Sequence, residues 1–147
     1  MGPGYEKLIV YWLATTIYDL TVVFCNRYID KKSRTHDQMV QAARSGKQNI
    51  VELTGVARNS FSELLEDYKD YLRQHDLPLW NKDDPRVCEI RFTNDPQSFC
   101  NLLITLCSKE GYLLDRLLAA NEQKFIKEGG FKENLFKKRM EFRKNNS

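Results

Sequence analysis

Apolar residues recur every three or four positions along most of this chain, which is the spacing of one face of an α-helix. The pattern predicts helices near residues 5–29, 36–52, 54–75 and 96–127. Two glycines, Gly129 and Gly130, end the last of these helices. No strand pattern is visible. The chain is therefore predicted to be all-α, an antiparallel up-down four-helix bundle with a short basic C-terminal helix.

The first predicted helix carries two apolar stripes. One stripe contains Leu8, Leu13, Ile17, Leu20, Phe24 and Tyr28, widened by Ile9 and Trp12. A helix that packs on one core needs only one apolar face, so a second stripe indicates burial on two sides. The second side would lie deep in the bundle or against another subunit. The candidates for an oligomer interface are Tyr11, Tyr18 and Val22, with Tyr71 from the third helix.

Helix ends are expected where short polar side chains can accept from free backbone N–H groups. Thr35 or Asp37 is expected to cap the second helix, and Asn94 or Asp95 the fourth. Within the long connection before the fourth helix, an Asp-Pro pair predicts a short helix over 85–91.

Composition and charge narrow the class only slightly. The 147 residues are 41% hydrophobic and 29% charged, as expected for one globular domain. We set residues 1–4 aside as a cloning remnant, and assign 5–127 to the bundle and 128–147 to a basic suffix. The net charge of +3 is unevenly distributed, because residues 131–147 alone hold six cations and two carboxylates.

Clustered cations can neutralise phosphates and release counterions, which favours nucleic-acid binding. One cluster lies in the suffix and a second lies at the start of the second predicted helix. The candidate nucleic-acid-binding residues are Arg34, Arg44, Lys47, Lys132, Lys137, Lys138, Arg139 and Arg143.

Residues that could carry enzyme chemistry are sparse. The four cysteines and two histidines lack the spacing of zinc ligands, and we interpret the cysteines as reduced, buried hydrophobes. Ser45-Gly46-Lys47 lacks the upstream glycine of a phosphate-binding loop. We therefore expect no enzyme activity, metal or cofactor. The longest uncharged apolar run, Leu8 to Tyr18, is too short to cross a bilayer, so a cytoplasmic protein is expected.

Four stretches are distinctive: YEKLIVY at 5–11, RTHDQMVQAARSGKQNI at 34–50, WNKDDPR at 80–86 and EGGF at 128–131. Together they resemble bacterial four-helix-bundle proteins of the 23S rRNA intervening-sequence family, in the branch with a "four helix bundle suffix" C-terminus. The resemblance covers nearly the whole chain. It implies an up-down bundle that assembles into a homopentameric ring. It also implies kinship with a basic pentameric barrel that binds nucleic acid and a reverse transcriptase.

The chain departs from this family after Glu52. Family members usually have a turn and a loop there, and the resemblance implies that a stretch on the order of fifteen residues is absent from this chain. Two interpretations stay open. Either a loop between Glu52 and Leu53 is missing from the printed residues, or the helices over 36–75 are fused. Fusion would remove the hairpin and require its halves to be exchanged with a neighbour, as in a domain swap.

Two functions follow from the sequence. The first is a non-enzymatic oligomeric adaptor that binds nucleic acid, RNA in particular. The alternative is a structural or scaffolding homo-oligomer whose partner is a protein.

Overall fold

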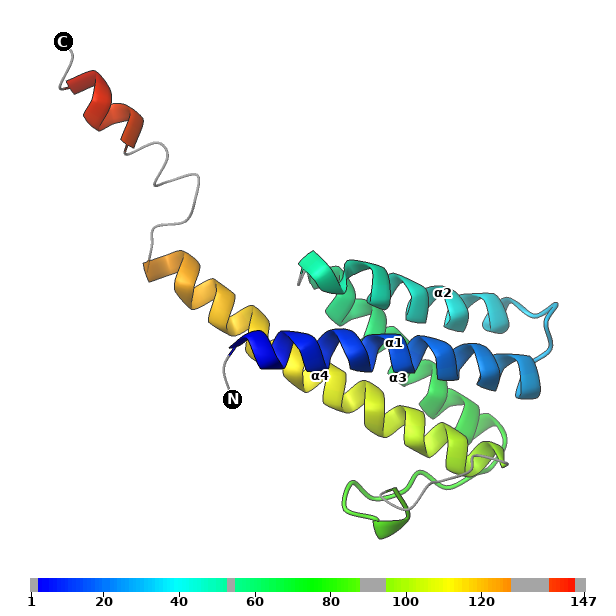
Figure 1. The fold of residues 1–147 in the computed structure, drawn as a ribbon. Helices are drawn as coiled ribbons and strands as arrows, with labels where there is room; N and C mark the ends of the chain where they lie inside the picture. Colours follow the sequence, from blue (N-terminus) through cyan, green and yellow to red (C-terminus); the bar gives the residue numbers. More distant parts are fainter. Residues whose placement is uncertain (1–2, 53–54, 88–94, 128–137, 145–147) are drawn as a thin grey trace.

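The structure is a computed structural model that describes residues 3–52, 55–87, 95–127 and 138–144. The bundle helices are α1 (Pro3–Tyr28), α2 (Arg34–Asn49), α3 (Gly55–Gln74) and α4 (Pro96–Lys127). Short 3-10 segments are η1 (Ile50–Glu52) and η2 (Pro85–Val87). A last helix covers 138–144. Throughout these ranges the chain forms no strand, so the predicted all-α bundle is confirmed (Figure 1).

The four long helices lie around a square, and each packs antiparallel to the next. Opposite ends of α1 and α4 meet, which closes the square. Glu6 near the start of α1 pairs with Arg116 of α4 at 3.1 Å. At the other end the rings of Phe24 and Phe99 lie 5.4 Å apart. This order is the up-down topology that short connections favour.

The helices α2 and α3 form a hairpin. The Ser60 hydroxyl lies 3.0 Å from the Ser45 hydroxyl, across the interface between the two helices. Fifteen residues of one continuous helix would separate these residues by about 22 Å. The fused helix is therefore wrong, and with it goes the reason for a domain swap. Leu53 and Thr54, beside the place where the other interpretation puts a missing loop, lie outside the described residues.

The predicted helix caps are right for α4 and wrong for α2. The Asp95 carboxylate accepts from the Ser98 N–H at 2.8 Å, as expected of a cap. Ser33 caps α2 instead of Thr35 or Asp37, because its hydroxyl accepts from the His36 N–H. Of the helix expected over 85–91, only the 3-10 turn at 85–87 lies among the described residues.

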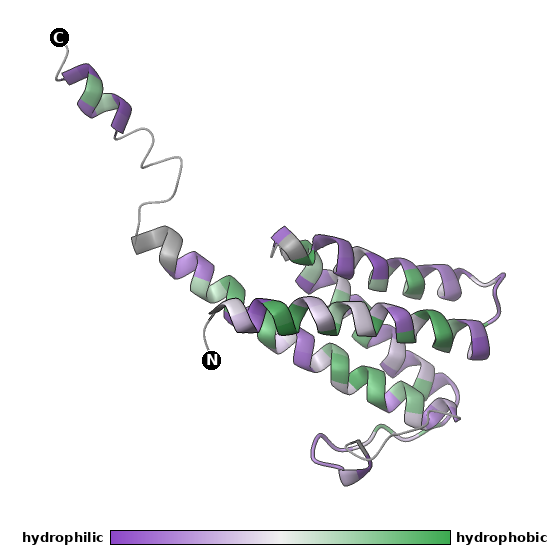
Figure 2. Cartoon of the chain, in the orientation of Figure 1, coloured by the Kyte–Doolittle hydropathy of each residue, from purple (hydrophilic) through white to green (hydrophobic). Residues whose placement is uncertain are grey.

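The core is centred on Phe24, whose ring is fully buried. Its centroid lies 5.0–5.4 Å from the rings of Tyr28, Tyr68, Tyr71 and Phe99, mostly edge to face. Such pairs stabilise a fold by about 0.5–1.5 kcal/mol each beyond their buried area. Hydropathy colouring shows more hydrophobic residues along α1 and α4 than along α2 (Figure 2). The ring contacts of Phe24 thus join α1, α3 and α4.

Two glycines allow close helix contacts. A Cβ added to Gly46 of α2 would lie 2.7 Å from the buried ring of Phe61 on α3. A Cβ added to Gly111 of α4 would lie 3.1 Å from the guanidinium of Arg58 on α3. Both glycines therefore lie at close contacts between helices.

Candidate functional site

The outer face of α1 is an exposed apolar surface formed by Tyr5, Leu8, Tyr11 and Trp12. Leu8 is 65% exposed and Trp12 is 67% exposed. No charged residue occurs between Lys7 and Asp19 along α1. An apolar cluster of this kind on a water-facing helix is a candidate contact surface.

The polar groups beside this face are already satisfied. The hydroxyl of Thr15 donates to the Tyr11 carbonyl at 3.1 Å, and that of Thr16 donates to the Trp12 carbonyl at 3.0 Å. Both hydroxyl groups would therefore keep their acceptors if another surface covered the outer face of α1.

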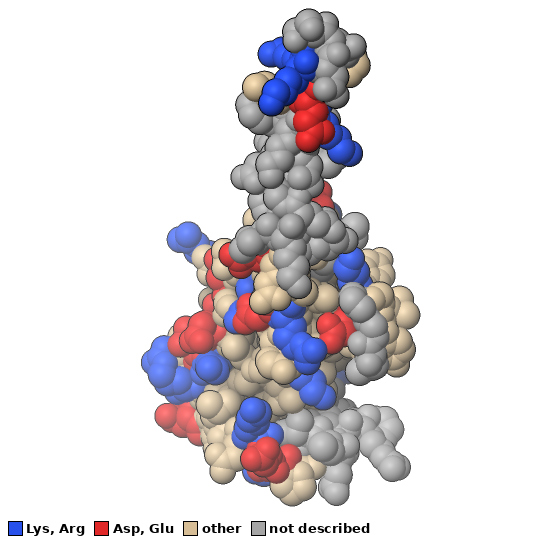
Figure 3. Space-filling view, turned by 90° about the vertical axis from the view of Figure 1, so that its left-hand side faces the viewer, with Lys and Arg blue, Asp and Glu red and all other residues tan. Residues whose placement is uncertain are grey.

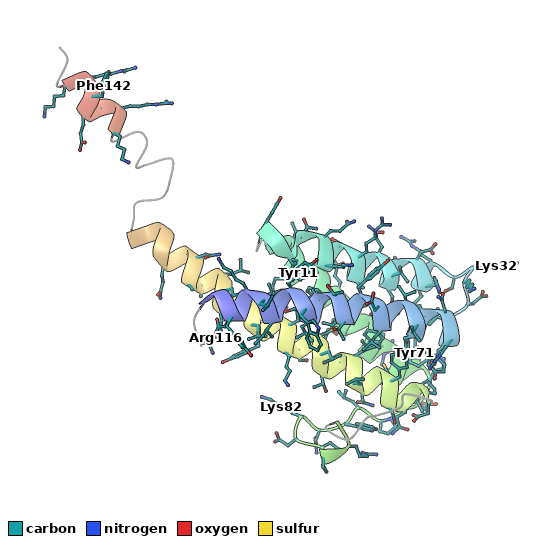
Figure 4. The ribbon with its side chains drawn as sticks, in the orientation of Figure 1. Tyr11, Lys32, Tyr71, Lys82, Arg116 and Phe142 are labelled. Atoms are coloured by element: carbon teal, nitrogen blue, oxygen red, sulfur yellow. The ribbon has the colours of Figure 1, made fainter. Side chains whose placement is uncertain are left out.

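The predicted interface residues are separated by the fold. Tyr11 is exposed on the outer face of α1, whereas Tyr18 and Val22 are half-buried. The ammonium of Lys47 covers the Tyr18 ring at 5.0 Å from the centroid. Tyr71 is only 8% exposed and packs against Phe24, so it offers little surface for a contact with another subunit (Figure 4).

Sequence reasoning placed Leu8 and Trp12 in the core stripe, and this was wrong. The core face of α1 instead holds Val10, Ala14 and Ile17, each with no exposed surface. Leu8 and Trp12 lie on the opposite side of the same helix. Residues 8–14 of α1 are apolar on every side of the helix, so no periodicity distinguishes the two sides.

The helix α1 is also long and apolar enough, by length and composition alone, to cross a bilayer. The uncharged run from Leu8 to Tyr18 is only part of this helix, which also contains Glu6, Lys7, Asp19 and Arg27. Of the apolar stretch, 39% is buried inside the bundle. Core helices of water-soluble bundles meet the same criterion, so α1 by itself does not discriminate between the two settings.

Part of the basic suffix is a described helix at 138–144. Lys138, Arg139 and Arg143 are all exposed there, beside Lys144 and a single carboxylate, Glu141. Figure 3 shows the cations of this helix at the far end of the molecule from the bundle. Lys132 and Lys137 lie outside the described residues.

The cations of α2 do not form one patch. Arg34 lines a groove between α2 and α3 with the carboxylates of Asp37, Glu63 and Asp67. Lys47 leans over Tyr18, on the side of α2 that faces α1. Arg34 and Lys47 are also separated by about 20 Å of helix. The sequence predicts that Arg34 and Lys47 both bind phosphates, but on one chain they do not lie on one contiguous surface.

The described cysteines are not activated nucleophiles. Burial raises the pKa of Cys25 and of Cys100 to about 12, and it raises the pKa of Cys107 as well. A thiol that stays protonated is a poor nucleophile and metal ligand. Within residues 3–52, 55–87, 95–127 and 138–144, no three His, Cys, Asp or Glu residues lie where they could hold a metal ion.

Among the described residues, one carboxyl group is buried without a hydrogen-bond partner. Glu110 of α4 has no exposed surface, and neither of its carboxylate oxygens accepts a hydrogen bond. Burial raises the pKa of Glu110 to about 8, so the group is mostly protonated at neutral pH. Because it has no exposed surface, Glu110 is a buried acid of the core.

The chain was compared with protein-family models, with curated proteins and with solved structures, and nothing matches in any of the three.

Proposed function

We propose that this protein is a non-enzymatic, homo-oligomeric adaptor that binds nucleic acid, RNA in particular, in the bacterial cytoplasm. The observation that carries the proposal is the set of exposed cations on the helix at 138–144. Four cations over seven residues, opposed by one carboxylate, attract phosphates and displace their counterions. Membership of the rRNA intervening-sequence family, and with it a pentameric ring, is part of the same proposal.

The outer face of α1 supports the oligomeric part. Tyr5, Leu8, Tyr11 and Trp12 would be removed from water by a second copy of the chain. Aromatic residues are enriched at the centres of such interfaces, while charged residues are depleted there. In a closed ring each suffix is repeated, so a modest charge per chain becomes a dense one.

The proposal is tested by measuring binding to structured RNA and to duplex DNA over a range of salt concentrations. The test variant carries Lys138→Gln, Arg139→Gln and Arg143→Gln. We expect weaker binding to both, and a slope of log affinity against log salt that is smaller by up to about 3 on duplex DNA.

A matched control carries the same charge change elsewhere, at the exposed Lys7, Lys31 and Lys32. We expect it to bind like the unmodified protein. Equal losses in the two variants would mean that only total charge matters. Failure of the unmodified protein to bind either nucleic acid at low salt would refute the proposal.

A second candidate, a scaffold that binds a protein partner, is favoured by the same outer face of α1. A single exposed apolar surface can serve either a second copy or another protein. The two candidates differ in what covers Leu8 and Trp12. An oligomer in which both residues are buried would leave no apolar surface there for another partner.

A further inference from the structure

A second surface, separate from the suffix and from the outer face of α1, is a groove beside α4. It has a volume of about 660 Å³ and lies between α3, α4 and the segment 79–83. Its walls combine cations with aromatic and aliphatic residues. Those that matter here are Lys69, Leu79, Trp80, Lys82, Lys109 and Tyr112.

The segment that forms one wall is fixed to α4. The Asn101 amide accepts from the Trp80 N–H at 2.8 Å and donates to the Pro78 carbonyl at 3.1 Å. Arg86 stacks on the Trp80 ring, with 4.1 Å between the guanidinium carbon and the ring centroid. Asp84 orients that guanidinium through hydrogen bonds of 2.7–3.3 Å. A wall held in this way needs little ordering when a ligand binds.

The groove is positively charged. Its lysines come from three elements: Lys69 from α3, Lys82 from the 79–83 segment (Figure 4) and Lys109 from α4. Asp83 is the single carboxylate in the lining. Lys69 has a long ion pair with Glu66, at 3.7 Å, whereas Lys82 and Lys109 form none among the described residues. These two ammonium groups are therefore available to an anionic ligand.

The groove is also aromatic. Tyr112 is 62% exposed, and Trp80 lines the same groove. Aromatic rings beside lysines are the combination on which single-stranded nucleic acids bind, because each unpaired base can stack while its phosphates meet cations. In a duplex the bases are already stacked and cannot reach a ring.

We propose that this groove binds single-stranded nucleic acid, with an unpaired base against Tyr112 and Trp80 and the flanking phosphates at Lys82 and Lys109. This proposal rests on the nucleic-acid function proposed above and deepens it. The suffix would supply sequence-independent attraction, and the groove would select strands with unpaired bases. A volume of about 660 Å³ lies within the range of small-ligand pockets, which suits one nucleotide.

The test uses the full chain and two probes of equal charge, an oligothymidylate of about 12 nucleotides and an abasic strand of the same length. We expect the unmodified protein to prefer the oligothymidylate by roughly fivefold or more, which is the lower end of stacking on one ring. Tyr112→Ala, at an exposed site that should not perturb folding, is expected to remove this preference. Its affinity for the abasic strand should be unchanged.

Lys82→Gln with Lys109→Gln should weaken binding of both strands, because it removes contacts to phosphates. The control Lys31→Gln with Lys32→Gln makes the same charge change on the loop between α1 and α2 and should leave both affinities unchanged. Equal affinity for the two strands in the unmodified protein would overturn the groove, as would an unchanged preference in Tyr112→Ala.

The outcomes separate the two proposals. Loss of all binding in the suffix variant, with no effect of Tyr112→Ala, would leave the adaptor function standing and refute the groove. Loss of the base preference in Tyr112→Ala, with no effect of the suffix variant, would support the groove and refute the role of the suffix. No binding by the unmodified protein would refute both.

Discussion

At the scale of single residues, Glu110 contributes to how the stability of the bundle depends on pH. Its pKa is raised to about 8 by burial, from an ordinary value of 4.5 that it regains on unfolding. Between these values the folded state holds a proton that the unfolded state has lost. Stability from this group is therefore fully present below pH 4.5 and falls by about 1.4 kcal/mol per pH unit as pH rises, until pH 8.

Glu110→Gln should remove this dependence, because an amide has no proton to lose in this range. We expect the variant to be more stable than the unmodified protein at pH 8 and to show a flatter profile between pH 5 and pH 8. Urea unfolding at several pH values measures the effect. Glu122→Gln, at an exposed site on α4, is the control and should keep the original profile. The assignment fails when both variants have the same slope.

Gly46 and Gly111 should respond differently to alanine. At Gly46 the new methyl group would lie 2.7 Å from the buried Phe61 ring, so Gly46→Ala should lower the free energy of unfolding. Better helix propensity offsets part of this, leaving a net loss on the order of 1 kcal/mol. At Gly111 the neighbour is the guanidinium of Arg58, the end of a long side chain. Gly111→Ala should be neutral or slightly stabilising.

Thermal or urea unfolding of the two alanine variants tests this directly. Equal stability of the two variants would show that the interface of α2 and α3 accommodates the new methyl group as easily as the long side chain of Arg58 does. That result would contradict the close contact between Gly46 and Phe61.

At the scale of elements, one buried amide holds the connection between α3 and α4 in place. Asn101 is 2% exposed and bonds to the backbone at Trp80, Pro78 and Gln97. In the described part of the connection before Val87, most residues are exposed, so this part buries little apolar surface of its own. The groove beside α4 consequently depends on these hydrogen bonds.

Asn101→Ala should free this connection. It leaves the Trp80 N–H and the Pro78 carbonyl without partners, at a cost of about 1–3 kcal/mol if they stay buried. We expect faster hydrogen exchange at the Trp80 amide, with exchange in the core of α1 changed far less. Gln97→Ala, whose backbone carbonyl remains as an acceptor, is the control. Unchanged exchange at Trp80 would show that other contacts hold the segment.

At the scale of the whole molecule, the outer face of α1 is the surface through which we expect the bundle to self-associate. A helix in a monomeric bundle is expected to expose mainly polar residues, yet Leu8 and Trp12 are both about two-thirds exposed. The α1 and α4 helices extend together beyond the hairpin of α2 and α3 (Figure 1). The apolar face at that end is thus accessible to a second chain.

Leu8→Gln with Trp12→Gln should lower the oligomer mass, since the change removes apolar area from an interface and leaves the core intact. Light scattering and sedimentation measure the mass, and circular dichroism checks that helix content is kept. Val56→Gln, at an exposed apolar site on α3, is the control. A purified protein that is monomeric before any change would refute self-association through this face.

The sequence by itself determined the helices, because their signals are local. Periodic apolar residues and the cap at Asp95 both act within a few residues of one element. Only the tertiary structure decided which side of α1 is buried. Residues 8–14 are apolar on every side of the helix, so the apolar pattern does not indicate which side faces the core. The hairpin of α2 and α3 was also a tertiary matter, since an unbroken apolar stripe fits a fused helix equally well. The groove could be found only from the tertiary structure. Lys69, Lys82 and Tyr112 come from separate elements, and their spacing along the chain does not predict that they lie close together.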